Sequence, residues 1–169
     1  MASGIVHDFT GAIAAVAAVP ISAILFGAEN VLPFTAGAAA GFIWLSPDLD
    51  MAHSWPSKRW LIFHPLTHFY RKVHYRHRGA SHWPVVGSGV RMLFLIALLM
   101  VLRVIAILVY QETGYRFLPI DPIDLVMAYG LMFWFGVEYA SMNHVAFDLL
   151  ANIIPALNDR GSWINRRLR

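Results

Sequence analysis

The stretch MLFLIALLMVLRVIAILVY, residues 92–110, contains a single charged side chain, Arg103, in an otherwise apolar run. A helix needs about 20 predominantly apolar residues to cross the hydrocarbon core of a bilayer. Residues 9–28 and 125–142 form comparable runs, and residues 31–45 form a shorter run that is rich in Gly and Ala. The sequence therefore predicts an all-α integral membrane protein, a bundle of about four transmembrane helices at 9–28, 31–45, 92–110 and 125–142.

The composition agrees with a chain that contacts lipid. Hydrophobic residues make up 58% of the 169 residues and charged residues 14%, whereas about a quarter of the residues are charged in an ordinary soluble domain. A chain of this length suits one domain, so we expect residues 1–169 to form a single membrane-embedded unit. A compact soluble helical domain is the alternative, but four long apolar runs are difficult to bury in so short a chain. No Lys or Arg precedes residues 9–28, so we expect this run to be retained and not cleaved as a signal peptide.

Residues 46–83 differ in composition from the apolar runs. From Met51 to Trp83 there is no Asp or Glu, while six Lys and Arg and six of the eight His are interleaved with Trp and Tyr. Such aromatic residues concentrate at membrane interfaces, so we place this segment on the headgroup surface, with a short helix around residues 65–74 and with anionic lipid headgroups as partners. Four spans put this segment and both termini on one side, which the positive-inside rule identifies as the cytoplasmic side of an inner or plasma membrane.

Four motifs that contain His or Asp lie at the ends of the expected spans. They are Ser-Gly-x-x-His-Asp (residues 3–8), Ser-Pro-Asp-Leu-Asp (46–50), His-Arg-Gly-Ala-Ser-His (77–82) and His144-x-x-x-Asp148. In the last motif, positions i and i+4 share one helical face, a spacing by which a helix supplies two ligands to a metal. Each motif alone is more often a helix cap, a turn or a surface pair. Because the topology brings all four to the same membrane face, we predict a cytoplasm-facing divalent metal site there.

The chemistry of these side chains limits the choice of metal. The sequence has no Cys, so a metal ion would be bound by nitrogen and oxygen atoms. A mixed set of imidazole and carboxylate ligands suits zinc, with manganese or iron as competitors. The number of carboxylates would permit two or three adjacent ions.

The motifs, in this order and together with Arg59-Trp60, Tyr70-Arg71, Pro84 and Gly87, resemble those of a family of uncharacterised predicted metal-binding membrane proteins of bacteria and archaea. The chain is similar, more distantly, to membrane-bound metal-dependent hydrolases of the YdjM type. Those proteins look like relatives of the all-helical zinc-dependent phospholipase C and S1/P1 nuclease fold, which cleaves phosphate esters with a trinuclear zinc cluster. The resemblance implies a ligand set of His7, Asp50, His82, His144 and Asp148. The chain lacks the additional helical His-x-x-x-Glu pair of the soluble enzymes.

From these residues we expect a membrane-bound metal-dependent hydrolase that acts on a phosphoester, such as that of a lipid. If Asp50 is a ligand, Asp48 is the candidate general base or the residue that orients a ligand, and Arg78 is suited to bind the phosphate. The alternative is a non-catalytic metal-binding membrane protein with a structural, sensing or metal-handling role. We do not expect a nucleic-acid-binding protein, although cations interleaved with aromatic residues could also bind phosphates of a single strand.

Two charged residues of the expected spans lie outside these motifs. Arg103 and Glu138 would each be unpaired in lipid, where an isolated charge is costly. We expect them to form an ion pair between the third and fourth spans; the alternative is that Glu138 faces the metal site.

Overall fold

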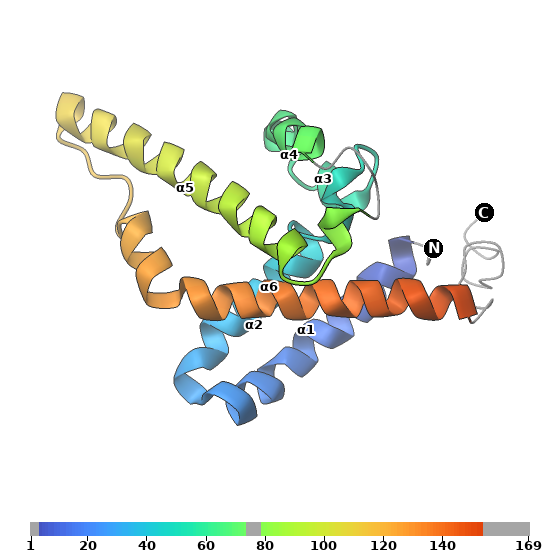
Figure 1. Cartoon of the computed structure of the whole chain (residues 1–169). Helices are drawn as coiled ribbons and strands as arrows, with labels where there is room; N and C mark the ends of the chain where they lie inside the picture. Colours follow the sequence, from blue (N-terminus) through green and yellow to red (C-terminus); the bar gives the residue numbers. More distant parts are fainter. Residues whose placement is uncertain (1–3, 74–78, 154–169) are drawn as a thin grey trace.

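The computed structural model describes residues 4–73 and 79–153, and within this part every regular element is a helix (Figure 1). Three of the helices are long and apolar enough to cross a membrane: α1 (Gly4–Phe26), α5 (Val86–Thr113) and α6 (Pro122–Ile153). They contain the expected spans at 92–110 and 125–142 in full and most of the span at 9–28. The all-α prediction is confirmed for the described part, and the three helices support association with a membrane.

The second expected span is shorter than predicted. Helix α2 (Val31–Ile43) has 13 residues, which at about 1.5 Å per residue extends about 20 Å, while the hydrocarbon core is about 30 Å thick. The helix ends at Ile43 with Trp44 as its C-cap, and Ser46 and Pro47 then begin a new turn. A fourth crossing of the membrane therefore stays a prediction. Helices α1 and α2 form an antiparallel hairpin, so the end of α2 returns toward the start of α1 (Figure 1).

Helix α2 packs along α6 at a distance that only glycine permits. A Cβ atom at Gly37 of α2 would lie 2.0 Å from the carbonyl oxygen of Phe133, and one at Gly136 of α6 would lie 2.0 Å from the carbonyl oxygen of Phe34. Small residues allow helices to approach closely in lipid, where apolar burial alone does not drive association. The Gly- and Ala-rich composition of residues 31–45 is thereby explained.

The segment between α2 and α5 folds into short helices, which Figure 1 shows above α6, whereas the bend of the α1–α2 hairpin lies below it. Their order is η2 (Pro47–Asp50), α3 (Trp55–Lys58), η3 (Leu61–Leu66), α4 (Thr67–Val73) and η4 (Ala80–His82). The helix expected around residues 65–74 is confirmed by α4. Side-chain hydrogen bonds connect the segment internally and to α2: Arg71 donates to Ser57 Oγ at 3.0 Å, and the indole N–H of Trp60 donates to the carbonyl of Trp44 at 3.2 Å.

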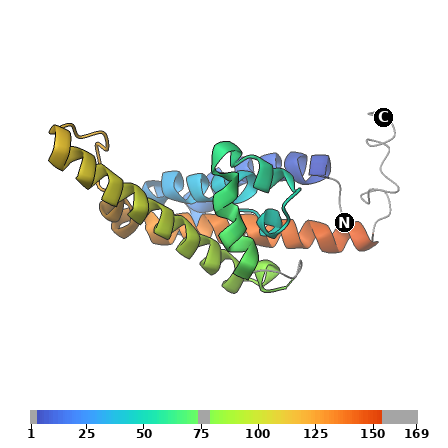
Figure 2. The same ribbon diagram turned by 90° about the horizontal axis from the view of Figure 1, so that it is seen from above.

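Helix α5 leaves the bundle soon after it begins. Figures 1 and 2 show that its C-terminal part projects beyond the other helices. Only 6% of its most apolar stretch is buried, compared with 22% for the corresponding stretches of α1 and α6. Its buried residues are confined to the first two turns: Gly87, Ser88, Arg91 and Met92. The apolar side chains of the later turns of α5 are exposed, and such a surface is favourable in contact with lipid.

The expected ion pair between Arg103 and Glu138 is wrong. Arg103 Nε donates to both carboxylate oxygens of Asp121 at 2.9 Å, because α5 diverges from α6 and brings Arg103 near the connection between them. Glu138 Oε1 instead accepts a hydrogen bond of 3.0 Å from the backbone N–H of Val85. Val85 has φ 65°, a left-handed conformation that is unfavourable for a β-branched residue. Glu138 thus binds the backbone of the strained N-cap residue immediately before α5.

Candidate metal centre

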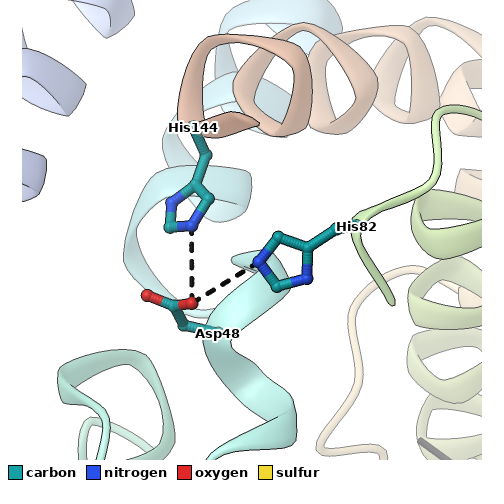
Figure 3. A group of neighbouring side chains, drawn as sticks. All are labelled: Asp48, His82 and His144. Carbon is teal, nitrogen blue, oxygen red and sulfur yellow. Dashed lines mark ion pairs between the residues drawn. The ribbon is translucent and has the colours of Figure 1, made fainter. Parts of the chain in front are cut away.

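Three side chains from distant parts of the sequence converge beside α6. Asp48 comes from η2, His82 from η4 and His144 from α6, and Figure 3 shows both imidazole rings directed at the same carboxylate. Asp48 Oδ1 lies 3.4 Å from His144 Nε2 and 3.7 Å from His82 Nε2. One ligand atom from each of the three residues lies within 4.8 Å of the other two. The described part of the chain therefore contains a compact group of two imidazoles and one carboxylate.

The Ser-Pro-Asp-Leu-Asp motif directs Asp48 into this group by forming a capped turn. Ser46 is the N-cap of η2, its hydroxyl accepts from the backbone N–H of Asp48 at 3.4 Å, and Pro47 occupies the first position. Leu49 is completely buried and anchors the turn against the protein interior. Residues 46–50 can thus form a capped turn and at the same time present the Asp48 carboxylate to a metal ion.

His144 lies on the buried face of α6, and Asp148 lies one turn further along the same helix. Both residues are buried. This agrees with their i, i+4 spacing, which places both side chains on the same face of the helix. The His144 ring lies edge-on to that of His82, with 5.7 Å between the ring centroids. Its Nδ1 atom is 3.5 Å from Ser46 Oγ, so its Nε2 atom points to Asp48.

The spacing and chemistry of these atoms fit a divalent ion. The two nitrogen–oxygen distances are longer than a normal hydrogen bond. Ligand bonds to zinc are about 2.0–2.2 Å long, which places two ligands of a tetrahedral ion about 3.4 Å apart. The three side chains are only 8 to 15% exposed, and two imidazoles with one carboxylate are a donor set found in both zinc and iron sites. Each residue presents the atom that a metal would bind.

The other residues predicted for the site have different positions. Asp50 Oδ2 accepts a 2.7 Å hydrogen bond from Ser81 Oγ and is not part of the three-residue group within the described part of the chain. Asp148 is buried on α6 but is also outside that group. His7 lies in α1, and its side chain is outside the described part, as is the whole of Arg78. The structure thus brings together Asp48, His82 and His144, and the roles of all these residues stay predictions.

Sequence reasoning assigned no role at the site to Arg91, the largest fully buried side chain. Its Nη1 donates to the carbonyl of Ser81 at 2.8 Å and its Nη2 donates to Ser141 Oγ at 2.6 Å. Tyr70 of α4 is also buried, and its burial raises the pKa of its phenol, an effect that the nearby charge of Arg91 opposes. The position of Arg91 at the start of an apolar helix could have indicated its role, because buried charges in membrane proteins are costly and often functional.

Comparison with known proteins gives two matches and identifies no activity. The sequence model of the family described as "Uncharacterized metal-binding protein (DUF2227)" matches residues 2–157. An uncharacterized protein of Aquifex aeolicus (strain VF5) is 31% identical over 131 residues, which cover 73% of this chain and 92% of that relative. No solved structure matches the chain significantly. Neither match is to a hydrolase, so the more distant resemblance to metal-dependent hydrolases stays a prediction.

Proposed function

Because the chain belongs to the family of uncharacterized metal-binding proteins, we propose that it is a membrane protein that binds a divalent metal ion between Asp48, His82 and His144. The observation that supports this site is the convergence of one carboxylate oxygen and two imidazole Nε2 atoms from three separate segments. We propose zinc as the ion, because neutral imidazoles and a carboxylate are common zinc ligands.

Electrostatics supports the same assignment. The Asp48 side chain is 15% exposed, and the two side chains that face its Oδ1 are histidines. Transfer of a carboxylate from water into a protein interior is costly unless the charge is paired or coordinates a metal. Neutral imidazoles supply lone pairs. A divalent cation bound between them would be attracted by the carboxylate charge and coordinated by the two rings.

Metal analysis of the detergent-purified full chain tests this proposal. Wild-type protein and the variants Asp48→Ala, His144→Ala and Asp124→Ala are loaded with zinc, desalted and analysed for metal per chain. Asp124 is the control, since it is an exposed carboxylate in the first turn of α6. We expect wild type and the control to retain zinc, and the two site variants to lose it. Equal zinc content in all four proteins would refute the site.

Hydrolysis of a phosphoester is a second candidate function, supported by the number of ligands. Catalytic zinc sites commonly have three protein ligands and keep a fourth position for water, and the described part of the chain offers a group of three. A bound zinc ion would lower the pKa of its water and polarise a phosphoryl oxygen. Asp48, the expected general base, is a proposed ligand in this site, and Arg78 is the chain's own candidate for phosphate binding. The non-catalytic alternative requires only the site itself.

Turnover of a generic phosphodiester separates the two functions. We would assay bis(p-nitrophenyl) phosphate and phospholipid in mixed micelles with zinc-loaded wild type and with His144→Ala. Zinc-dependent turnover that is lost in His144→Ala supports a hydrolase. Stoichiometric zinc without turnover of either substrate favours the non-catalytic protein.

We also propose that the metal site faces the cytoplasm and that residues 46–83 contact anionic headgroups. The proposal follows from the positive-inside rule, and the absence of Cys from the chain provides its test. Lys58 of α3 and Arg116 between α5 and α6 are both exposed and lie on opposite sides of the α5 crossing. A membrane-impermeant maleimide applied to intact cells should label Arg116→Cys and not Lys58→Cys. The reverse pattern would contradict this orientation.

A further inference from the structure

Ser81 connects Asp50 to His82. Its hydroxyl oxygen lies 2.7 Å from Asp50 Oδ2 and 3.0 Å from His82 Nδ1. Ser81 is completely buried, so these contacts are made away from solvent. The serine therefore joins the carboxylate of one sequence motif to an imidazole of another.

The series of hydrogen bonds from His82 through Ser81 to Asp50 determines which ring nitrogen of His82 carries the hydrogen. A serine hydroxyl has one hydrogen, and Ser81 donates it to the carboxylate of Asp50, which is a hydrogen-bond acceptor when ionised. The oxygen of Ser81 can then only accept from His82, so the Nδ1 atom of that ring carries the hydrogen. In a neutral imidazole the other nitrogen, Nε2, then holds the lone pair. That atom is the one directed at Asp48, 3.7 Å away.

Arg91 fixes the position of this serine relative to α6. One of its N–H groups binds the carbonyl of Ser81 at 2.8 Å and another binds Ser141 Oγ at 2.6 Å. Ser141 lies about one helical turn before His144 on α6, and its hydroxyl donates to the carbonyl of Val137. A rigid planar guanidinium with two such contacts sets both distance and direction. Arg91 thereby ties the turn that carries His82 to the helix that carries His144.

We infer that Ser81 is the positioning residue of the metal centre: with Asp50 as its acceptor and Arg91 as its anchor, it presents Nε2 of His82 to the ion. This inference rests on the proposed metal-binding function. It also gives Asp50 a role that differs from direct coordination, since its charge acts on His82 through the serine hydroxyl. Partners that bind the second nitrogen of a metal-ligating histidine orient the ring and raise its basicity, and their loss commonly lowers metal affinity 10- to 100-fold.

The first test measures zinc affinity of the detergent-purified full chain by competition with a chromophoric chelator. Ser81→Ala should bind zinc about 10- to 100-fold more weakly than wild type. Ser22→Ala is the matched control, because Ser22 of α1 is also a completely buried serine, and its hydroxyl donates to the backbone carbonyl of Val19 at 2.9 Å. Its affinity should equal that of wild type. Equal affinities for Ser81→Ala and wild type would overturn the inference.

The second test observes the tautomer directly. In ¹⁵N-histidine NMR spectra of the metal-free protein, wild-type His82 should be the Nδ1–H tautomer, and Ser81→Ala should show a mixture. A merely structural role for Ser81 would leave the tautomer unchanged, and that result would overturn the inference. Loss of helical circular dichroism would identify a variant that fails to fold, in which case Asp50→Ala, which removes the acceptor of the Ser81 hydroxyl, provides the equivalent test.

Asp50→Asn distinguishes a positioning role from coordination. The amide oxygen of Asn still accepts the Ser81 hydrogen bond, so this variant should retain zinc with reduced affinity. Complete loss of zinc, as expected for His144→Ala, would make Asp50 a ligand and overturn the inference. Failure of the proposed function looks different: zinc would then be retained by both Asp48→Ala and His144→Ala.

Discussion

The first two turns of α5 and the remainder of that helix lie in contrasting environments. In the first two turns, Arg91 and Ser88 are completely buried and Met92 nearly so. Beyond them, apolar side chains such as Leu93 and Val101 are 67% and 58% exposed. Exposed apolar area of this extent is unfavourable in water but not in lipid. Along α5, the buried part therefore includes polar residues near the candidate metal site, whereas the exposed apolar remainder is suited to contact with lipid.

The two arginines of α5 differ in burial in the same way as the two parts of the helix. Arg91 is fully buried, and its charge interacts with those of Asp50 and Glu138. Arg103 is 35% exposed and pairs with Asp121, which is 37% exposed. Hydrogen bonds from the backbone N–H of Ile123 and from Arg103 hold the pKa of Asp121 below its ordinary value. The first arginine belongs to the protein interior and the second to the surface.

Replacement of Arg91 should produce the largest loss of stability. Arg91→Met removes the cation but preserves much of the side-chain volume, and leaves the carbonyl of Ser81 and the hydroxyl of Ser141 without this donor. Each hydrogen bond to a charged group contributes about 1.5–3 kcal/mol, so the loss of both should cost about 3–6 kcal/mol. We expect a loss of this size in the free energy of unfolding, measured by denaturant titration in detergent.

The matched change at the surface sharpens this comparison. Arg103→Met removes a partly exposed ion pair, and such pairs contribute about 0–1 kcal/mol. Similar losses for Arg91→Met and Arg103→Met would contradict the distinction between the two parts of α5.

A methyl group at the contact between α2 and α6 should have an intermediate effect. At Gly37 the added Cβ would meet backbone atoms of Phe133, so Gly37→Ala must push the helices apart, at a cost of about 1–3 kcal/mol as for other overpacked sites. Gly89 of α5 has no atom within 4 Å of an added Cβ. Gly89→Ala should therefore leave stability unchanged or raise it by up to about 1 kcal/mol, since Ala favours a helix. Thermal denaturation of the two variants in parallel would detect a failure of either expectation.

The smallest effect is expected on the exposed face of α5. Val101→Ala removes methyl groups that do not pack inside the protein, and the free energy of unfolding should change by less than about 0.5 kcal/mol. The same change at Val137, which is completely buried against Leu45 and Met92, should cost about 2 kcal/mol through the cavity it leaves. A larger loss at Val101 than at Val137 would show that α5 packs against protein beyond Met92.

The sequence was sufficient for features that depend on local pattern. Apolar runs located α1, α5 and α6, and the i, i+4 spacing placed His144 and Asp148 on one face of a helix. The length of α2 was overestimated because Trp44 and Leu45 are apolar but follow the end of the helix at Ile43. The partner of Arg103 was predicted incorrectly because the divergence of α5 from α6 leaves no local signal.

The inner arrangement of the site depends on tertiary contacts. Asp48 and Asp50 are two residues apart and equally suited to bind metal by type, and only the turn of η2 decides which carboxylate faces the histidines. The bonds of Arg91 to Ser81 and Ser141 likewise join segments that are distant in sequence. A single sequence contains no information on such pairs.

X-ray absorption at the zinc edge of the zinc-loaded full chain tests most directly whether these separate segments share one ion. The wild-type spectrum should show two imidazole nitrogens and at least one oxygen at about 2.0–2.2 Å, and His82→Ala and His144→Ala should each lose one imidazole. A wild-type spectrum without imidazole ligands, or one that neither substitution changes, would contradict the convergence of Asp48, His82 and His144 on a metal ion.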